Sequence, residues 1–207
     1  MPQRELSDPR ALRALAHPVR LRLLEELAAA GVATATELSE RVGESPANCS
    51  WHLRQLAQYG FVEESGGGRG RQRPWRIVIE RTIIGPGNGE PEVARAVDAV
   101  AGVIDDRAFQ AVRAWRAQRR SLPEAWQQAS FSTHSIVWLT ADELEQIENE
   151  IQQIMDRHVD RTVDPSRRPP GARAVRLSAW GFPSDLAGPA DEQAERTAER
   201  REAHDDD

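Results

Sequence analysis

Four arginines lie within eight residues of one another in the stretch GGGRGRQRPWR, which spans residues 66–76 and begins with three glycines. They are Arg69, Arg71, Arg73 and Arg76. Guanidinium groups can clamp a phosphate through two hydrogen bonds, and glycine lets a backbone approach another surface closely. The stretch therefore indicates a loop that grips an anionic partner. The alternative is a solvated loop whose arginines only keep the chain soluble.

The residues before this loop have the pattern of a helix that starts at Ser45-Pro46 and ends at Gly60. Cys49, Leu53 and Leu56 recur at helical spacing, and we expect them to point inward. The outward surface then carries Ala47, Asn48, Ser50, Trp51, Arg54 and Gln58. Ser45 lies at the positive end of the helix and suits a phosphate oxygen, while Arg54 suits guanine or phosphate. Such a helix is predicted to lie in the major groove of double-stranded DNA.

Helix signals upstream place this candidate as the fourth helix of the chain. Asp8-Pro9 is typical of an N-cap followed by a proline in the first turn, and that helix must stop before Pro18. A second helix is predicted up to Gly31, a typical C-terminal cap. Thr34 and Glu37 have the spacing of a capping box, so a third short helix should follow.

The arginine-rich loop is flanked by two segments with strand patterns, Phe61–Glu64 and Trp75–Ile79. The loop is therefore predicted to be the tip of a β-hairpin. Three helices, a tight turn, a fourth helix and a basic hairpin together make a winged helix-turn-helix, predicted for residues 1–82. Glycines would let the hairpin tip, the wing, lie along the minor groove, where arginine meets a strong negative potential.

Residues 9–80 resemble winged-helix transcription regulators of the ArsR/SmtB type, through AHPVRLRLLEELAA, TELSERVGESPANCSWHLRQLAQYGFVE and the arginine-rich wing. The resemblance implies a homodimeric regulator that binds an operator, often as a repressor that an effector releases. It places the following residues on DNA: Ser45, Pro46, Ala47, Asn48, Ser50, Trp51 and the wing arginines Arg69, Arg71 and Arg73. His52 is counted with this set, next to the core of the helix, where it would bond a backbone group or a phosphate. Trp51 departs from the family pattern, because a large aromatic side chain is unusual at that position.

The metal chemistry of that family is not expected here. The third helix reads Glu37-Leu38-Ser39-Glu40-Arg41, without cysteine, and residues 91–119 contain neither His nor Cys. No metal site, cofactor or enzymatic activity is predicted, since no nucleophile elbow or phosphate-binding loop is present. Cys49 is expected to be a buried apolar residue; a redox switch is the alternative.

Residues 83–90 are rich in glycine and proline and predict a linker. Beyond it, residues 91–119 predict one long helix, whose stripe of Val93, Val97, Val100 and Ile104 suggests dimerisation. Phe131–Leu139 and Val175–Ala179 are predicted as strands around a helix that Thr140 and Glu143 open and that ends near Thr162. Residues 91–184 are thus expected to form a small α/β unit and residues 185–207 a disordered acidic tail. The fold class is predicted as α+β.

Aromatic residues are concentrated in this second part, where they would suit a small-molecule effector. The candidate ligand residues are Trp115, Trp126, Phe131, Trp138 and Trp180. The alternative is that these rings fill a core rich in small residues.

The net charge of the chain is −6, but residues 1–82 alone sum to +2 and residues 184–207 to −6. The acidic balance therefore does not exclude a nucleic-acid partner. The apolar runs are too short for a membrane helix, so we expect no membrane partner and a cytoplasmic location. A sequence-specific, homodimeric DNA-binding regulator is the leading hypothesis. A winged helix that binds other proteins is the runner-up, and an enzyme with its site in residues 91–184 is the third.

Overall fold

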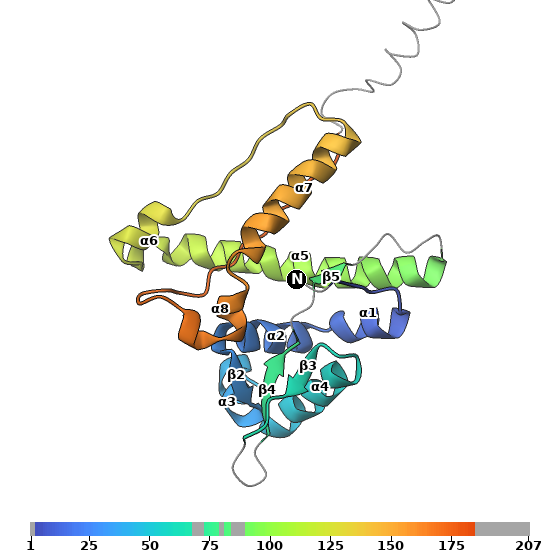
Figure 1. Cartoon of the computed structure of the whole chain (residues 1–207), viewed down its shortest axis with the longest axis vertical. Coiled ribbons are helices and arrows are strands. Elements are labelled where there is room, and N and C mark those ends of the chain that lie inside the picture. Colours follow the sequence, from blue (N-terminus) through green and yellow to red (C-terminus); the bar gives the residue numbers. More distant parts are fainter. Residues whose placement is uncertain (1–2, 68–72, 79–80, 84–89, 185–207) are drawn as a thin grey trace, which may run out of the picture. The chain divides into compact units, whose positions relative to one another are not determined.

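The computed structural model describes residues 3–67, 73–78, 81–83 and 90–184 (Figure 1). The N-terminal elements are β1 (Gln3–Glu5), α1 (Pro9–Leu15), α2 (Pro18–Ala30), β2 (Val32–Thr34), α3 (Ala35–Val42), α4 (Pro46–Gln58), β3 (Val62–Glu64), β4 (Pro74–Ile77) and β5 (Arg81–Ile83). They are followed by α5 (Pro91–Gln118), η1 (Arg119–Ser121), α6 (Glu124–Ala129), α7 (Ala141–Asp156), α8 (Asp160–Val163) and η2 (Pro165–Arg167). The α+β class is confirmed. The first compact unit is Met1–Ser130 with Ile151–Arg176, and the second is Phe131–Glu150 with Leu177–Asp207.

The first four helices begin where the sequence predicts, because a side chain caps each of them. Asp8 accepts a hydrogen bond from the backbone of α1, and His17 does the same for α2 through Nδ1. Thr34 and Glu37 form the expected capping box, with the Glu37 carboxylate 2.7 Å from the Thr34 backbone nitrogen. Ser45 caps α4. These bonds satisfy backbone N–H groups that have no partner inside a helix.

The core of the first unit is built from leucines of α1 to α4. The side chains of Leu12, Leu23, Leu27, Leu38, Cys49, Leu53 and Leu56 are fully buried. The prediction that Cys49, Leu53 and Leu56 point inward from α4 is confirmed. This packing fixes which surface α4 turns outward.

A three-stranded antiparallel sheet, in the order β2-β4-β3, adjoins these helices. The hairpin of β3 and β4 is the predicted one, with Glu63 opposite Arg76 and Val62 opposite Ile77. Ile79 lies outside the described residues. The third strand, β2, was not predicted, nor was the parallel pair of β1 and β5.

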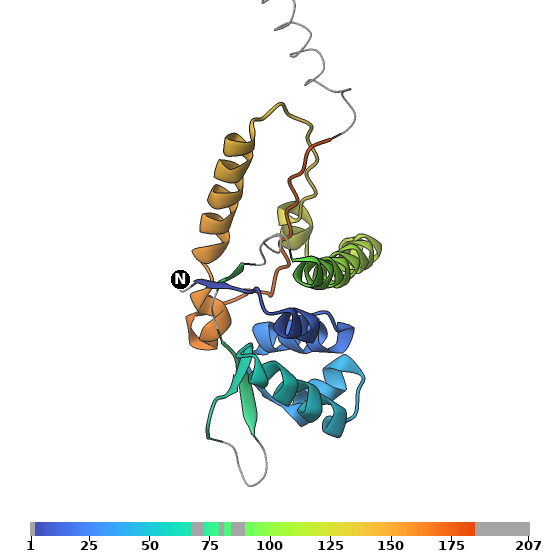
Figure 2. The same cartoon turned by 90° about the vertical axis from the view of Figure 1, so that its right-hand side faces the viewer.

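The long helix α5 confirms the prediction for residues 91–119, but its apolar stripe has a different role from the one expected. Val93, Ala96 and Val100 are buried in the same core cluster as α1 and α2. Figures 1 and 2 show α5 running over α1 and α2. The stripe is therefore largely used inside the chain, and it leaves only Ile104 substantially exposed. The predicted boundary near residue 83 does not separate two cores, and the residues 84–89 of the predicted linker lie outside the described part.

The strands predicted at Phe131–Leu139 and Val175–Ala179 are wrong, because both segments are without strand pairing in the structure. The capping box of Thr140 and Glu143 is confirmed, with the Glu143 carboxylate 2.7 Å from the Thr140 backbone nitrogen. The helix it opens, α7, ends at Asp156 rather than near Thr162, and the separate turn of α8 follows. The predicted tail, residues 185–207, lies outside the described residues.

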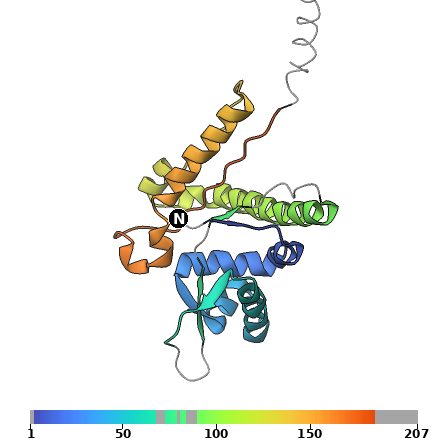
Figure 3. The same ribbon diagram turned by 45° about the vertical axis from the view of Figure 1, so that its right-hand side comes forward.

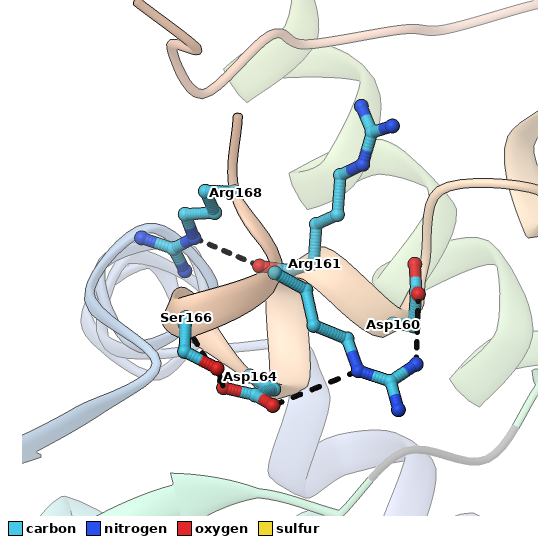
Figure 4. Close-up of polar contacts among 6 residues, drawn as sticks. Asp160, Arg161, Asp164, Ser166 and Arg168 are labelled. Carbon is cyan, nitrogen blue, oxygen red and sulfur yellow. Dashed lines mark hydrogen bonds and ion pairs between the residues drawn. The ribbon is translucent and has the colours of Figure 1, made fainter. Parts of the chain in front are cut away.

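Residues 160–176 form a clasp on the end of α2. The clasp is held together by its own polar contacts: Arg167 pairs with Asp160 at 3.1 Å, and Ser166 donates to Asp164 (Figure 4). Arg168 donates to the carbonyl oxygen of Ala29 on α2 at 2.8 Å. Gly31 has φ +84° and lies directly against Pro165, so a larger residue there would meet both strain and a clash.

Glu25 links this clasp to the long helix. Its carboxylate accepts hydrogen bonds from Arg107 of α5, with Nε 3.1 Å from Oε1, and pairs with Arg176 at 2.8 Å. Burial alone would raise the pKa of Glu25, but the bonds from Arg107 and Arg176 outweigh it, and the pKa lies below its usual value. Three segments that are distant in the sequence thus meet at one charged group.

Replacing Glu25 with glutamine is expected to lower the free energy of unfolding at pH 7 by about 1–3 kcal/mol, because two arginines lose a charged acceptor. The folded-state pKa of Glu25 is lowered, so its stabilisation is complete above the unfolded-state pKa of about 4.3 and is lost as the pH falls through the folded-state value. Urea unfolding between pH 7 and pH 3 should therefore show a steeper loss for the wild type than for Glu25→Gln. The exposed Glu40→Gln is the control, and parallel curves for the wild type and Glu25→Gln would contradict the assignment.

Candidate nucleic-acid interface

The turn between α3 and α4 sets the direction of α4. Gly43 adopts the left-handed conformation at φ +72° and ψ +30°, which strains residues with a side chain, and its N–H bonds back to the Ser39 carbonyl oxygen at 3.0 Å. Ser45 then accepts a hydrogen bond from the Asn48 N–H at 3.2 Å. The tight turn that the sequence predicts before the fourth helix is thus found at residues 43–45. Figure 3 shows α4 on the side of α2 that faces away from α5.

The first turns of α4 present an outward surface of the composition that the sequence predicts. Ser45, Pro46 and Ala47 are exposed, and Trp51 is 48% exposed although it is a large aromatic residue. Asn48 and Ser50 are half-buried, and Arg54 is exposed. The structure thus brings together these seven of the predicted DNA-facing residues on one helix.

Two hydrogen bonds preset the polar side chains on this surface. Arg54 donates to the Ser50 hydroxyl at 2.6 Å, one helical turn earlier. This bond holds the guanidinium along the helix and leaves most of its donors available. Asn48 donates to the Glu44 carboxylate at 2.7 Å, so Asn48 must give up this bond before its amide nitrogen can meet a base.

His52 does not belong to this surface. Its side chain is only 4% exposed and packs against His17 and Trp51, with ring centroids 4.7 Å and 4.8 Å away. The prediction that His52 faces DNA is therefore corrected: position 52 lies on the inward face with Cys49, Leu53 and Leu56. Burial, followed by the nearby charge of Arg20, lowers the pKa of His17, and burial with His17 and Arg20 lowers that of His52. Both imidazoles are thus favoured in the neutral form.

Cys49 is fully buried, as expected, and burial raises the pKa of its thiol. The reactive thiolate is therefore disfavoured in the folded protein. The chain contains no other cysteine.

Glycines shape the backbone of the wing, and two of its arginines already form ion pairs with glutamates of the hairpin. Gly66 and Gly67 both have positive φ, +75° and +76°, where other residues are strained. Arg73 pairs with Glu64 at 2.9 Å, and Arg76 pairs with Glu63 at 2.7 Å. All four side chains are well exposed, so each pair is weak and can exchange for a phosphate. Arg69 and Arg71 lie outside the described residues.

The five aromatic residues predicted to bind a ligand do not all lie in one unit. Trp115 lies on α5, and Trp126 of α6 is half-buried with the Arg173 guanidinium 5.8 Å from its ring centroid. Phe131, Trp138 and Trp180 belong to the second unit and are 74%, 78% and 48% exposed. An effector site formed by these residues stays a prediction. Among the described residues, no group of three or more His, Cys, Asp or Glu side chains could hold a metal ion.

Some features of the interface were missed by the sequence reasoning. Two of them could have been predicted from spacing. Glu44 precedes Asn48 by four residues, about one helical turn, and the hairpin register places Glu63 opposite Arg76. The contact between His17 and His52 joins residues 35 positions apart, so no local sequence pattern predicts it.

Comparison with known proteins agrees with this geometry. Residues 15–65 match a family model described as a helix-turn-helix domain, which covers α2, α3, α4 and β3. No curated protein matches the chain. None of the helices in the described residues is long and apolar enough to cross a membrane. The chain thus contains a helix-turn-helix domain, the kind of domain that binds DNA in transcription regulators.

Proposed function

We propose that this chain is a sequence-specific regulator of transcription that binds double-stranded DNA as a homodimer in the cytoplasm. The observation that carries the proposal is the exposed start of α4, with Ser45, Ala47 and Trp51 facing outward from a helix-turn-helix domain. A buried or strongly acidic α4 surface would not suit DNA. The runner-up role, a winged helix that binds proteins, would not require the arginines of the wing.

In the proposed complex, α4 enters the major groove, which is about 12 Å wide and admits one helix. Small side chains at Ser45 and Ala47 allow close approach to the bases, and the positive end of α4 attracts a phosphate. Arg54 reads guanine or binds a phosphate. The wing follows the minor groove, where Arg69, Arg71 and Arg73 meet phosphates or the groove floor.

Repression by occlusion of a promoter is the regulatory mode we propose, in line with the resemblance to ArsR/SmtB-type regulators. Two copies would read two half-sites about 34 Å apart, which is one turn of the duplex. A small apolar or cationic effector that binds aromatic residues of 91–184 would release the operator. Catalysis has no part in this role.

Selection from a pool of random duplexes tests the proposal. The full chain should enrich one motif with two-fold symmetry, and a duplex with both half-sites should bind more tightly than one with a single half-site at the same salt concentration. Recovery of an unenriched pool would contradict sequence-specific binding. Equal affinity for the full site and the half-site would contradict dimeric binding but not sequence-specific binding.

A further inference from the structure

The second unit exposes an unusual number of large apolar side chains. On the segment 131–139, Phe131 and Trp138 are 74% and 78% exposed, and Ile136, Val137 and Leu139 are exposed as well. On the segment 177–182, Phe182 is 74% exposed and Leu177 is also exposed. Helix α7, of which residues 141–150 belong to this unit, contains no buried residue. These side chains have no cover in the described part of the chain.

The exposed apolar side chains make up a large part of what a stable dimer buries. A buried aromatic side chain removes about 150–250 Å² from water, so the exposed parts of Phe131, Trp138 and Phe182 amount to about 400 Å². The four exposed aliphatic residues of the two segments, Ile136, Val137, Leu139 and Leu177, add to this apolar surface. A standard interface buries about 800 Å² on each partner, of which somewhat more than half is apolar. The exposed apolar side chains of one face of the segment 131–139, together with those of the segment 177–182, therefore supply much of the apolar part of an ordinary homodimer interface.

The backbone of the segment 131–139 is also available. No main-chain hydrogen bond that joins this segment to any described residue is present, and the segment is not part of a sheet. An extended segment with free N–H and C=O groups and exposed apolar side chains is a template for strand addition. Ile136 and Trp138 lie on one face of such a strand, and Val137 and Leu139 on the other.

Charge favours a second copy of the same chain as the partner. The sequences FSTHSIVWL (131–139) and LSAWGF (177–182) contain no Asp, Glu, Lys or Arg. Two copies can therefore pair without placing like charges opposite each other. Helix α7 has six acidic residues and no basic one, so α7 repels its own copy and leaves the neutral segments as the contact. The apolar stripe of α5 is largely buried in the core of its own chain.

We propose that two copies of this chain associate through the second unit, with Phe131–Leu139 of each copy as paired strands and Phe182 and Leu177 covered beside them. The inference rests on the proposed function only in taking the dimer as the active form. It assigns the interface to residues 131–139 and 177–182 rather than to the stripe of α5.

Sedimentation of the full chain tests the proposal. The wild type should be a dimer, and the double variant Ile136→Glu with Trp138→Glu should dissociate at least 100-fold more readily, with an unchanged circular dichroism spectrum. Both side chains are mostly exposed, so the variant should fold. The matched control is Ile104→Glu on α5, which should remain a dimer. A monomeric wild type, or a dimer that Ile104→Glu breaks and the double variant does not, would overturn the proposal.

Crosslinking gives a second measurement that does not depend on stability. Because Cys49 is buried, a single cysteine at Ser135 can be joined to its copy by a short bis-maleimide, whereas Ala125→Cys on the exposed surface of α6 should not be joined. Equal yields at both positions would overturn the proposal. A monomer that still binds a half-site duplex would refute this interface and leave the DNA-binding role intact. A dimer that is crosslinked through residue 135 but binds no duplex would support this interface and refute the DNA-binding role.

Discussion

Replacing Arg69, Arg71 and Arg73 together with glutamine is expected to weaken binding to the selected duplex about 100-fold or more at 0.1 M salt. Each arginine that neutralises one phosphate contributes about 0.9 to the slope of log affinity against log salt concentration, so the slope should fall by about 2.7. The loss should be similar for specific and unrelated duplexes, because phosphate contacts do not read sequence. Fluorescence anisotropy titrations from 0.05 to 0.3 M salt measure both quantities.

The structure supplies a control with the opposite sign. Glu64 holds Arg73 in an exposed ion pair. Glu64→Gln removes this competitor for the guanidinium, so DNA binding should become several-fold tighter. An unchanged affinity and slope for the triple variant would show that the wing does not touch DNA. That result would favour the alternative in which the winged helix binds other proteins.

Truncation at two positions of α4, two residues apart, should have opposite consequences. Leu53 is fully buried in the core, and Leu53→Ala should lower the free energy of unfolding by about 2–5 kcal/mol, a large share of the 5–15 kcal/mol typical of a domain. Trp51 is 48% exposed, and Trp51→Ala should change stability by about 1 kcal/mol at most. Trp51→Ala should instead weaken DNA binding about tenfold, because it removes contact area in the groove.

Urea unfolding followed by circular dichroism, together with anisotropy at a temperature where both variants are folded, separates the two effects. Leu53→Ala should bind DNA nearly as well as the wild type once it is folded. Equal losses of stability in the two variants would mean that Trp51 is a core residue and that the outward face of α4 is misassigned.

The helices of the first unit could be predicted because their signals are local. The side chains of Asp8, Thr34 and Ser45 accept hydrogen bonds from backbone N–H groups only two or three residues later. A few consecutive residues therefore suffice to predict where each helix begins. The inward position of His52 was also readable. Cys49, His52, Leu53 and Leu56 have the i, i+3, i+4, i+7 spacing of one helix face.

The missing parts depend on contacts between distant residues. β2 has only three residues, too few to show an alternation, and it exists because Ala33 lies opposite Trp75 of β4. The stripe of α5 would look the same whether it covers its own domain or a partner. At Phe131–Leu139 the strand pattern was real, but a strand also needs a neighbour, and the described residues provide none.

Site-directed cleavage of DNA from the start of α4 tests the central claim most directly. Ala47 is exposed and Cys49 is buried, so Ala47→Cys can carry a single iron-EDTA reagent. The reagent should cut the selected duplex at one cluster of positions inside each half-site, with the strand offset of a source in the major groove. The same reagent at Ala125→Cys on α6 should leave the duplex intact. Uniform or absent cleavage from position 47, with binding retained, would show that α4 does not enter the groove.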